Sequence, residues 1–250
     1  MQQSEWFNDE SFWIATYPFM FPEDSFERAI AEIPKIVTLT ECPKGSWILD
    51  LCCGPGRHSV PLAKHGFNVI GVDRSAFLLG KAKAYAEREH VKATWIQEDM
   101  RRFIQPDTFA LALSMFTSFG FFDDMKENES VLKNMYSSLV EHGVLILDVI
   151  GKEVLAKIFQ PTGSQALPNG DVRFERRFLR GDWERIENEW VIVSGNEAKK
   201  FRLRLWLFSA RELKELLRTV GFEKVTIYGN LDGNGYGLDS SRLIAVARKQ

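Results

Sequence analysis

The sequence contains little cysteine and little histidine. Its 250 residues include 3 cysteines and 4 histidines, and two of the cysteines, Cys52 and Cys53, are adjacent. An odd number with that spacing argues against a disulfide framework, which a chain of this length does not need for stability. No spacing between cysteine and histidine matches a metal site. We therefore expect a cytoplasmic protein that folds without disulfides and without a bound metal.

Long apolar runs are also missing. No stretch of the chain approaches the length of a membrane-spanning helix. The first residues lack the basic region and the apolar core of a signal peptide. Neither membrane insertion nor export is expected.

Positive charge is not in excess. The formal net charge is -2, whereas proteins that hold nucleic acid through counterion release usually present a strongly basic face. The local basic cluster over residues 173–204 alternates with acidic residues, which is typical of a solvated surface of strands. A groove for RNA or for an anionic substrate is the alternative interpretation of that cluster.

Apolar residues are plentiful. Hydrophobic residues make up 45% of the chain and aromatic residues 12%, so one large domain can bury an adequate core. Residues 48–73 organise this domain and read ILDLCCGPGRHSVPLAKHGFNVIGVD. Their pattern predicts a strand, a tight loop, a helix and a second strand. Asp73 then lies at the carboxyl end of the second strand, where open α/β sheets bind ligands.

The loop between the first strand and the helix indicates a nucleoside ligand. Gly54 and Gly56 have no Cβ, so the loop can turn sharply and a ligand can approach the main chain. A carboxylate roughly 20 residues further on, here Asp73, suits the two hydroxyl groups of a ribose. A dinucleotide-binding loop has a third glycine where this chain has Ser59, which weakens an NAD-binding interpretation.

An acidic residue before the glycines narrows the choice of ligand. Asp50 completes the motif D-x-C-C-G-P-G-R, which resembles motif I of the class I methyltransferases that depend on S-adenosylmethionine (SAM). Residues 116–122, FTSFGFF, and the later segment RELKELLRTVGF are similar to a bacterial small-molecule group of that class. The likeness spans nearly the whole chain. It implies in-line transfer of a methyl group from SAM to a nitrogen or oxygen nucleophile of a small molecule.

The resemblance assigns part of the cofactor site to the first two strands. Asp50, Gly54 and Gly56 would surround the methionine part of SAM, with Cys52 in the same loop. Asp73 would bind the ribose hydroxyl groups.

The remaining cofactor residues implied by the resemblance come from later strands and from the N-terminus. Arg74 would flank the adenine, and Asp99 and Met100 would bind it. Met115 would lie under the cofactor. Tyr17 would reach the cofactor carboxylate from an N-terminal lid.

Helical and strand periodicities alternate along the chain, as a parallel sheet requires. The predicted fold class is α/β, with a seven-stranded, mostly parallel, doubly wound sheet whose last strand is antiparallel, an N-terminal helical lid and an inserted antiparallel β meander. The single domain is divided into the lid (1–45), a cofactor-binding core (46–150), an inserted β substrate cap (165–208) and a C-terminal helix with a strand pair (209–250). We expect helices over 25–38, 75–87 and 128–140, a strand over 144–149, and three β runs over 173–179, 185–193 and 201–208.

Aromatic side chains predict the acceptor site. An apolar or cation-attracting pocket of this kind suits a small amine or an aromatic acceptor. The fourth strand is followed by neither an N-P-P-Y sequence nor a Pro-Cys nucleophile, which argues against base flipping and DNA methylation. The predicted pocket residues are Phe116, Phe119, Phe122, Trp190 and Trp206.

A protonated acceptor also needs a general base. The candidates near the expected pocket are His58, Asp148 and Tyr17. Two other functions stay open: an RNA-modifying SAM methyltransferase, and a nucleotide-binding oxidoreductase or non-catalytic SAM sensor. We expect a monomer or weak homodimer with a small-molecule substrate and without DNA or membrane partners, and the charge disfavours RNA.

Overall fold

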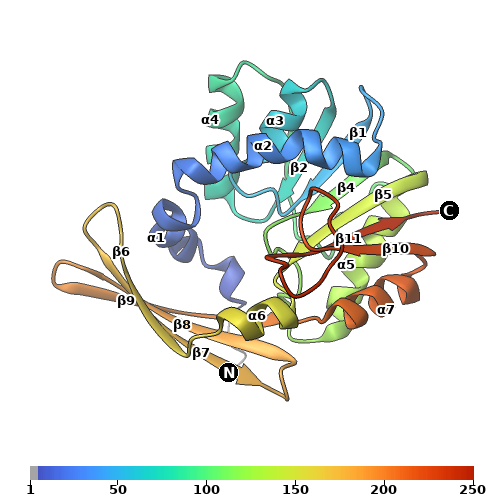
Figure 1. Ribbon diagram of the computed structural model, residues 1–250. Coiled ribbons are helices and arrows are strands. Elements are labelled where there is room, and N and C mark those ends of the chain that lie inside the picture. The colour runs from blue at the N-terminus through green and yellow to red at the C-terminus, as the bar shows by residue number, and fades with distance from the viewer. Residues whose placement is uncertain (1–4) are drawn as a thin grey trace.

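Seven strands form the larger of two sheets in the computed structural model, which describes residues 5–250 (Figure 1). Their order is β10-β11-β5-β4-β1-β2-β3. Among these strands β11 runs antiparallel to both of its neighbours, and the other adjacent pairs are parallel. The expected mostly parallel sheet with an antiparallel last strand is confirmed. The strands are β1 Trp47–Leu51, β2 Asn68–Asp73, β3 Thr94–Gln97, β4 Phe109–Ser114, β5 Leu139–Val149, β10 Lys224–Tyr228 and β11 Leu243–Arg248.

Helices cover both faces of this sheet because the side chains of each strand alternate between the faces. Ile48, Leu111 and Ile146 pack in one cluster with residues of α2 and α3. Their neighbours Leu49, Ala112 and Leu147 pack in another with α5 and α7. The helices are α2 Glu23–Thr40, α3 Ser59–Lys64, α4 Ala76–Arg88, α5 Met125–Ser138 and α7 Ala210–Val220.

α2 belongs to these layers and not to a lid. Ile33 and Ile36 are fully buried in the same cluster as β1 and β4, and Pro34 lies inside the helix without ending it. The predicted lid over 1–45 is therefore reduced in the described residues to a short 3-10 helix, η1 Trp6–Asn8, and α1 Glu10–Met20.

The lid is anchored at both ends. The Glu10 carboxylate accepts hydrogen bonds from the Ser75 hydroxyl and the Ala76 N–H, at 2.9 and 2.8 Å, at the start of α4. At the other end the Trp6 indole donates to the Arg204 carbonyl at 3.3 Å. The N-terminal segment thus connects α4, on the larger sheet, to β9 of the smaller sheet.

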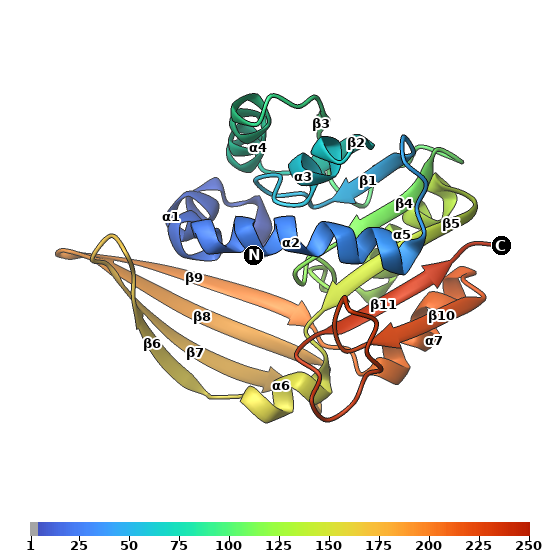
Figure 2. The same cartoon turned by 45° about the horizontal axis from the view of Figure 1, so that its top comes forward.

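The second sheet follows a helix that was not predicted, α6 Lys152–Ile158. Its four antiparallel strands are β6 Thr162–Ala166, β7 Val172–Arg180, β8 Arg185–Ser194 and β9 Glu197–Trp206. The sequence predicts only three of them because β6 reads TGSQA, which has no apolar alternation. Figure 2 shows the sheet extending across from α1 and α2.

Two element boundaries also differ from the prediction. β5 begins at Leu139 and not near residue 144, because a register shift lets it pair with β4 at Phe109 before the regular ladder starts. α5 begins at Met125 because the Asp124 side chain accepts a hydrogen bond from Lys126 N–H and caps the helix. Within the part of the chain that the structure describes, no helix has the length and apolar character to span a membrane.

Candidate functional site

The site lies where the strand order reverses, at the carboxyl ends of β1 and β4, which are neighbours in the sheet. Three non-glycine residues there have left-handed backbones, with φ of 60° at Cys52, 59° at Phe116 and 60° at Thr117. Backbone strain of this kind concentrates at functional sites. Open α/β sheets bind ligands at such a reversal point.

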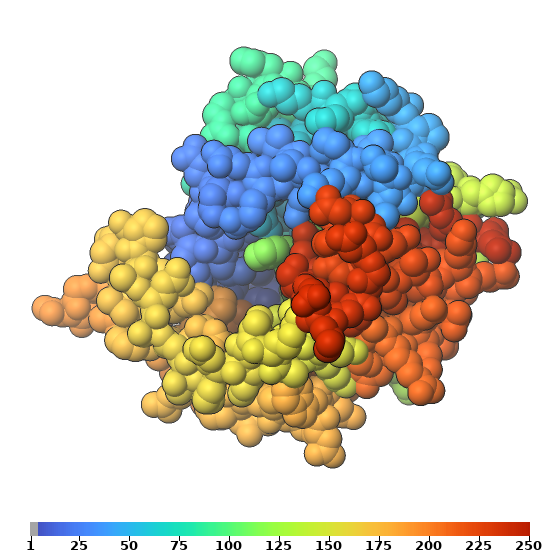
Figure 3. Space-filling view, viewed as in Figure 1, coloured from blue at the N-terminus to red at the C-terminus, as the bar shows by residue number. Residues whose placement is uncertain are grey.

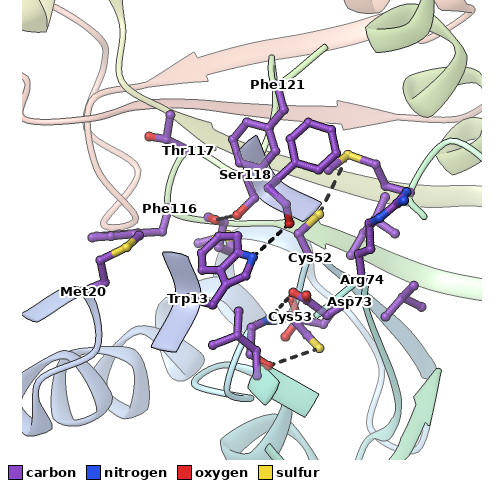
Figure 4. Close-up of a pocket in the computed structure, with 18 of the residues that line it drawn as sticks. Trp13, Met20, Cys52, Cys53, Asp73, Arg74, Phe116, Thr117, Ser118 and Phe121 are labelled. Carbon is purple, nitrogen blue, oxygen red and sulfur yellow. Dashed lines mark hydrogen bonds between the residues drawn. The ribbon is translucent and has the colours of Figure 1, made fainter. Parts of the chain in front are cut away.

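A cavity opens beside these loops. Its empty space is about 1220 Å³, a figure that includes space open to solvent. Figure 4 shows Trp13 of α1 between Met20, which lies beside Phe116, and the residues Asp73 and Arg74 at the end of β2. The predicted site residues that line the cavity are Asp50, Cys52, Gly54, His58, Asp73, Arg74, Asp99, Met100, Met115, Phe116, Phe122 and Trp190.

The two glycines of the loop have different roles. Both have positive φ, 55° at Gly54 and 81° at Gly56. A Cβ on Gly54 would lie 3.6 Å from the Phe21 ring, on the wall of the cavity. A Cβ on Gly56 would lie 3.1 Å from both Ala82 and Trp95. Gly56 therefore lets α4 and β3 pack against the loop. The sequence predicts Gly56 beside the cofactor, but the structure does not place it on the lining of the cavity.

Asp73 ties the loop to the end of β2. Its carboxylate accepts hydrogen bonds from the Gly54 N–H at 2.8 Å and the Ser75 N–H at 2.9 Å. Burial raises the pKa of Asp73 to about 6, although both N–H groups lower it. A carboxylate has about four lone-pair sites, so it can still accept from a ligand.

Asp50 lies behind the loop. It is 2% exposed and accepts a hydrogen bond from the Ser59 hydroxyl. Burial raises the pKa of Asp50, and the nearby charge of His58 and the hydroxyl of Ser59 oppose that shift. Ser59, which stands where a dinucleotide-binding loop has glycine, thus holds a carboxylate of the site.

Asp99 is surrounded by arginine. It pairs with Arg74 and accepts from Arg101 at 2.6 Å. Burial opposes its charge, but the hydrogen bonds and charge of Arg101 outweigh burial and lower the pKa of Asp99 below its ordinary value. Beside it, Cys52 Sγ lies 3.8 Å from Met100 Sδ. Burial raises the pKa of the Cys52 thiol well above its ordinary value, so this thiol stays neutral.

Three predicted residues do not face the cavity. The Tyr17 ring packs 5.5 Å from the rings of both Phe21 and Phe77, on the side of α1 that meets α4. Phe119 is 2% exposed and stacks on a core phenylalanine of the loop after β9. The Trp206 indole donates to the Phe122 carbonyl at 2.8 Å and holds the two sheets together. Each of these side chains is used in packing, so none is placed to contact a ligand in this cavity.

Arg57 is a site residue that the sequence analysis missed. Its guanidinium carbon lies 5.0 Å from the Phe21 centroid and 4.5 Å from the Phe116 centroid. It is 8% exposed and forms no ion pair among residues 5–250. Burial lowers the pKa of Arg57 to about 10, so it stays charged at neutral pH. The only sequence signal was its place directly after the glycine loop.

A second chamber adjoins the cavity between α2, α6 and β7, with about 1600 Å³ of empty space including its open mouth. Figure 3 shows a hollow there, bordered by the blue N-terminal helices, the yellow segment around α6 and the red C-terminal loop. The residues that line both spaces are Arg57, His58, Phe116, Thr117, Asn188, Trp190 and Leu205.

A buried ionic network forms one wall of the chamber. Asp148, 3% exposed, accepts from the Phe116 N–H at 2.7 Å and from Arg242 Nε at 2.9 Å. Arg242 also pairs with Glu32, which lies 2.8 Å from His58 Nε2. Burial raises the pKa of Glu32, but the hydrogen bonds and charges of His58 and Arg242 outweigh burial and lower this pKa to about 2. Of the three predicted bases, Asp148 is occupied by its partners and Tyr17 is outside, which leaves His58.

The strand order, the glycine loop and the acidic residues at or just after the carboxyl ends of β1, β2 and β3, around one cavity, define the fold of class I methyltransferases. A family model described as "Methyltransferase domain" matches residues 48–143. The chain is a SAM-dependent methyltransferase, and SAM is its cofactor.

The relatives and the solved structures agree with this assignment. A glycine/sarcosine N-methyltransferase from Aphanothece halophytica is 28% identical over 206 residues, which cover 81% of this chain and 76% of that protein. The CcbJ methyltransferase from Streptomyces caelestis has a TM-score of 0.79 at 16% identity, covering 100% of this chain and 99% of that one. SAM-bound CalS10, an amino pentose methyltransferase from Micromonospora echinaspora, has a TM-score of 0.68 at 20% identity, covering 96% and 97%.

Proposed function

We propose that this enzyme transfers a methyl group from SAM to a nitrogen atom of a small molecule, with an oxygen nucleophile as the alternative. The observation that carries the proposal is the junction of two spaces at Arg57, His58, Phe116 and Thr117, which line both of them. One space holds the groups that SAM needs, and the other is open to an acceptor. Relatives named for glycine, sarcosine and an amino pentose support a small amine.

The cavity residues fit each polar group of SAM. Buried Asp50 suits the methionine amine. Arg57, which forms no ion pair among the described residues, suits the methionine carboxylate, because a guanidinium can bind a carboxylate through two hydrogen bonds. Asp73 suits the ribose hydroxyl groups. Asp99, held by two arginines, suits the adenine amine beside Met100. Arg57 thus takes the role that the sequence analysis gave to Tyr17.

Bound SAM supplies a methyl group that is already activated on a sulfonium. The protein has to hold the acceptor in line at about 3 Å and keep water out. Phe116 and Met115 form an apolar wall next to the junction. His58, with Nε2 held by Glu32, is the residue that accepts a proton from a protonated acceptor.

The basic cluster of the second sheet supports a small substrate rather than RNA. Glu189 pairs with both Lys200, at 2.6 Å, and Arg202, at 3.4 Å. Arg180 lies 3.9 Å from Glu187. Paired charges offer little to a polyanion. The proposal includes a cytoplasmic location and a monomer or weak homodimer.

Calorimetric titration with SAM, S-adenosylhomocysteine and NAD tests the cofactor, and a screen of small amines, phenols and acids for methyl transfer tests the reaction. We expect the first two ligands to bind, NAD not to bind, and small amines to be methylated. Binding of NAD alone would favour an oxidoreductase. SAM binding without turnover on any small acceptor, together with steeply salt-dependent RNA binding, would favour the RNA-modifying alternative.

Replacement of Asp73 by alanine is expected to weaken binding of S-adenosylhomocysteine roughly ten- to a hundredfold. The substitution removes a charged acceptor for two hydroxyl groups, worth about 1.5–3 kcal/mol in total. It also frees the Gly54 N–H that Asp73 holds. Calorimetry measures the change, and an unaltered affinity would contradict the placement of the ribose.

The same carboxylate predicts a pH dependence of cofactor binding. Below a pH of about 6 the free enzyme holds a proton on Asp73, and this proton must leave before hydroxyl groups can donate to both oxygens. Affinity should therefore be constant above that pH and fall about tenfold per pH unit below it. Asp73→Asn should abolish the slope, and a slope retained in that variant would assign the proton to another group.

A further inference from the structure

Two buried N–H groups of the second sheet have no hydrogen-bond acceptor among the described residues: Nε of Arg173 on β7 and Nε1 of Trp190 on β8. The Arg173 guanidinium carbon lies 5.0 Å from the centroid of the Trp190 ring. Solvent does not reach either atom, so bulk water does not replace the missing acceptor. Native proteins pair nearly all such groups, and an orphaned donor calls for an explanation such as a ligand.

Both residues line the second chamber, and Arg173 does not line the cofactor cavity. Arg173 therefore belongs to the space that an acceptor would fill, and Trp190 lies where that space meets the cofactor cavity. The contrast along β7 is clear: the Arg173 side chain is 15% exposed, whereas Arg180 on the same strand is 56% exposed. The basic cluster that the sequence analysis treated as one surface is divided between the chamber and solvent.

The charges of the chamber do not balance. Glu175 is shared by Arg177 and by Arg173, whose closest nitrogen lies 3.5 Å away. Arg57, at the junction with the cofactor cavity, has no acidic partner among residues 5–250. The lining contains more arginines (Arg28, Arg57, Arg173, Arg177 and Arg242) than carboxylates (Glu32, Asp148 and Glu175).

The Arg173 guanidinium is held by two aromatic rings and by one long ion pair. It lies over the faces of Phe19, at 4.8 Å, and Trp190, at 5.0 Å, and its one ion pair is long. Burial lowers the pKa of Arg173, which shows the cost of keeping this charge away from water.

We propose that the methyl acceptor carries an anionic oxygen group, a carboxylate or a phosphate, that binds to Arg173 and Trp190 in the second chamber. The proposal rests on the proposed function, because it names the class of acceptor for that reaction. The anionic group is held on β7 and β8, with Arg173 in the second chamber and Trp190 at its boundary with the cofactor cavity, while the nucleophile points toward the junction at Phe116. Arg173 and Trp190 are then specificity-determining residues.

Nitrogen-15 NMR tests the site without any turnover, since indole and arginine Nε–H groups give separate signals. The enzyme, saturated with S-adenosylhomocysteine, is titrated with sodium acetate and, in a second series, with inorganic phosphate. The Trp190 signal is identified by its loss in Trp190→Phe, which keeps a ring and removes the N–H. We expect saturable shifts of the Trp190 and Arg173 signals, and the anion that binds more tightly identifies the group.

Variants on one strand provide the matched comparison. Arg173→Leu should abolish the Trp190 shift, whereas Arg180→Leu, on the solvent side of β7, should leave it unchanged. If neither anion shifts the Trp190 signal in the wild-type enzyme, the proposed site is wrong. An equal effect of both substitutions would also overturn it, because it would show a non-specific charge effect.

Methyl transfer to matched acceptors separates this inference from the proposed function. The pairs are glycine with glycinamide, β-alanine with β-alaninamide, and glucosamine 6-phosphate with glucosamine. The anionic member should have at least tenfold higher kcat/KM, and Arg173→Leu should remove that preference mainly by raising KM. Equal use of both members would overturn the inference and leave a small-molecule methyltransferase. Failure of SAM to bind would overturn both.

Discussion

Replacement of Arg242 by leucine is expected to lower the free energy of unfolding by about 3–5 kcal/mol. Arg242 joins Asp148 on β5 to Glu32 on α2, and these two elements lie far apart in the chain. Burial opposes its charge, but the hydrogen bonds and charges of both carboxylates raise the pKa of Arg242 above its ordinary value. Leucine would leave Asp148, 3% exposed, as a buried charge without its cationic partner, held only by the Phe116 N–H.

Urea denaturation at neutral pH measures this loss. Arg248→Leu is the control, because its partner Glu41 is 80% exposed and a surface pair contributes less than about 1 kcal/mol. The double variant Arg242→Leu, Asp148→Asn should recover part of the stability, since it removes the unpaired charge. A loss below about 1 kcal/mol in the single variant would mean that water reaches Asp148 and solvates it.

Replacement of His58 by glutamine is expected to lower kcat about a hundredfold on a protonated amine acceptor, the lower end of what general bases contribute. His58 is 6% exposed, lines both spaces and lies 2.8 Å from the Glu32 carboxylate. The low pKa of Glu32, about 2, keeps that carboxylate ionised at working pH. It therefore holds the imidazole in one orientation.

The pH profile distinguishes a base from a residue that only positions other groups. If His58 is the base, the glutamine variant should lack the pH dependence that kcat shows in the wild-type enzyme. His65→Gln is the matched control, because His65 hydrogen-bonds to the Pro61 carbonyl at the far end of α3. A raised KM with unchanged kcat would show that His58 only shapes the chamber.

The elements that define the fold were predictable because their periodicity is local. β1, the glycine loop and β2 follow from apolar runs around Gly54 and Gly56, and Asp73 was placed correctly at the end of β2. The antiparallel direction of β11 was predicted from the resemblance of the whole chain to class I methyltransferases. The six residues of this strand do not indicate its direction by themselves. β6 and α6 were missed, since neither carries a pattern that differs from that of a loop.

The roles of aromatic residues were predicted less well. Phe116, Phe119 and Phe122 share one short loop, yet Phe116 and Phe122 line the cavity while Phe119 is in the core. The left-handed backbone at Phe116 turns that segment, and no composition signal marks it. The position of the Tyr17 ring was not predictable for a similar reason, because the packing of α1 on α4 decides where that ring lies.

The sequence by itself determined the class of enzyme, the glycine loop and the acidic residues at or just after the carboxyl ends of β1, β2 and β3. These depend on neighbours in the chain and on strand ends, which the βαβ order brings to one edge. Only the tertiary structure decided that Arg57 forms no ion pair within residues 5–250, that Glu32 holds His58, and that Arg173 meets Trp190 in the second chamber. Those relations join segments far apart in the chain, and side-chain packing between elements, not local periodicity, determines them.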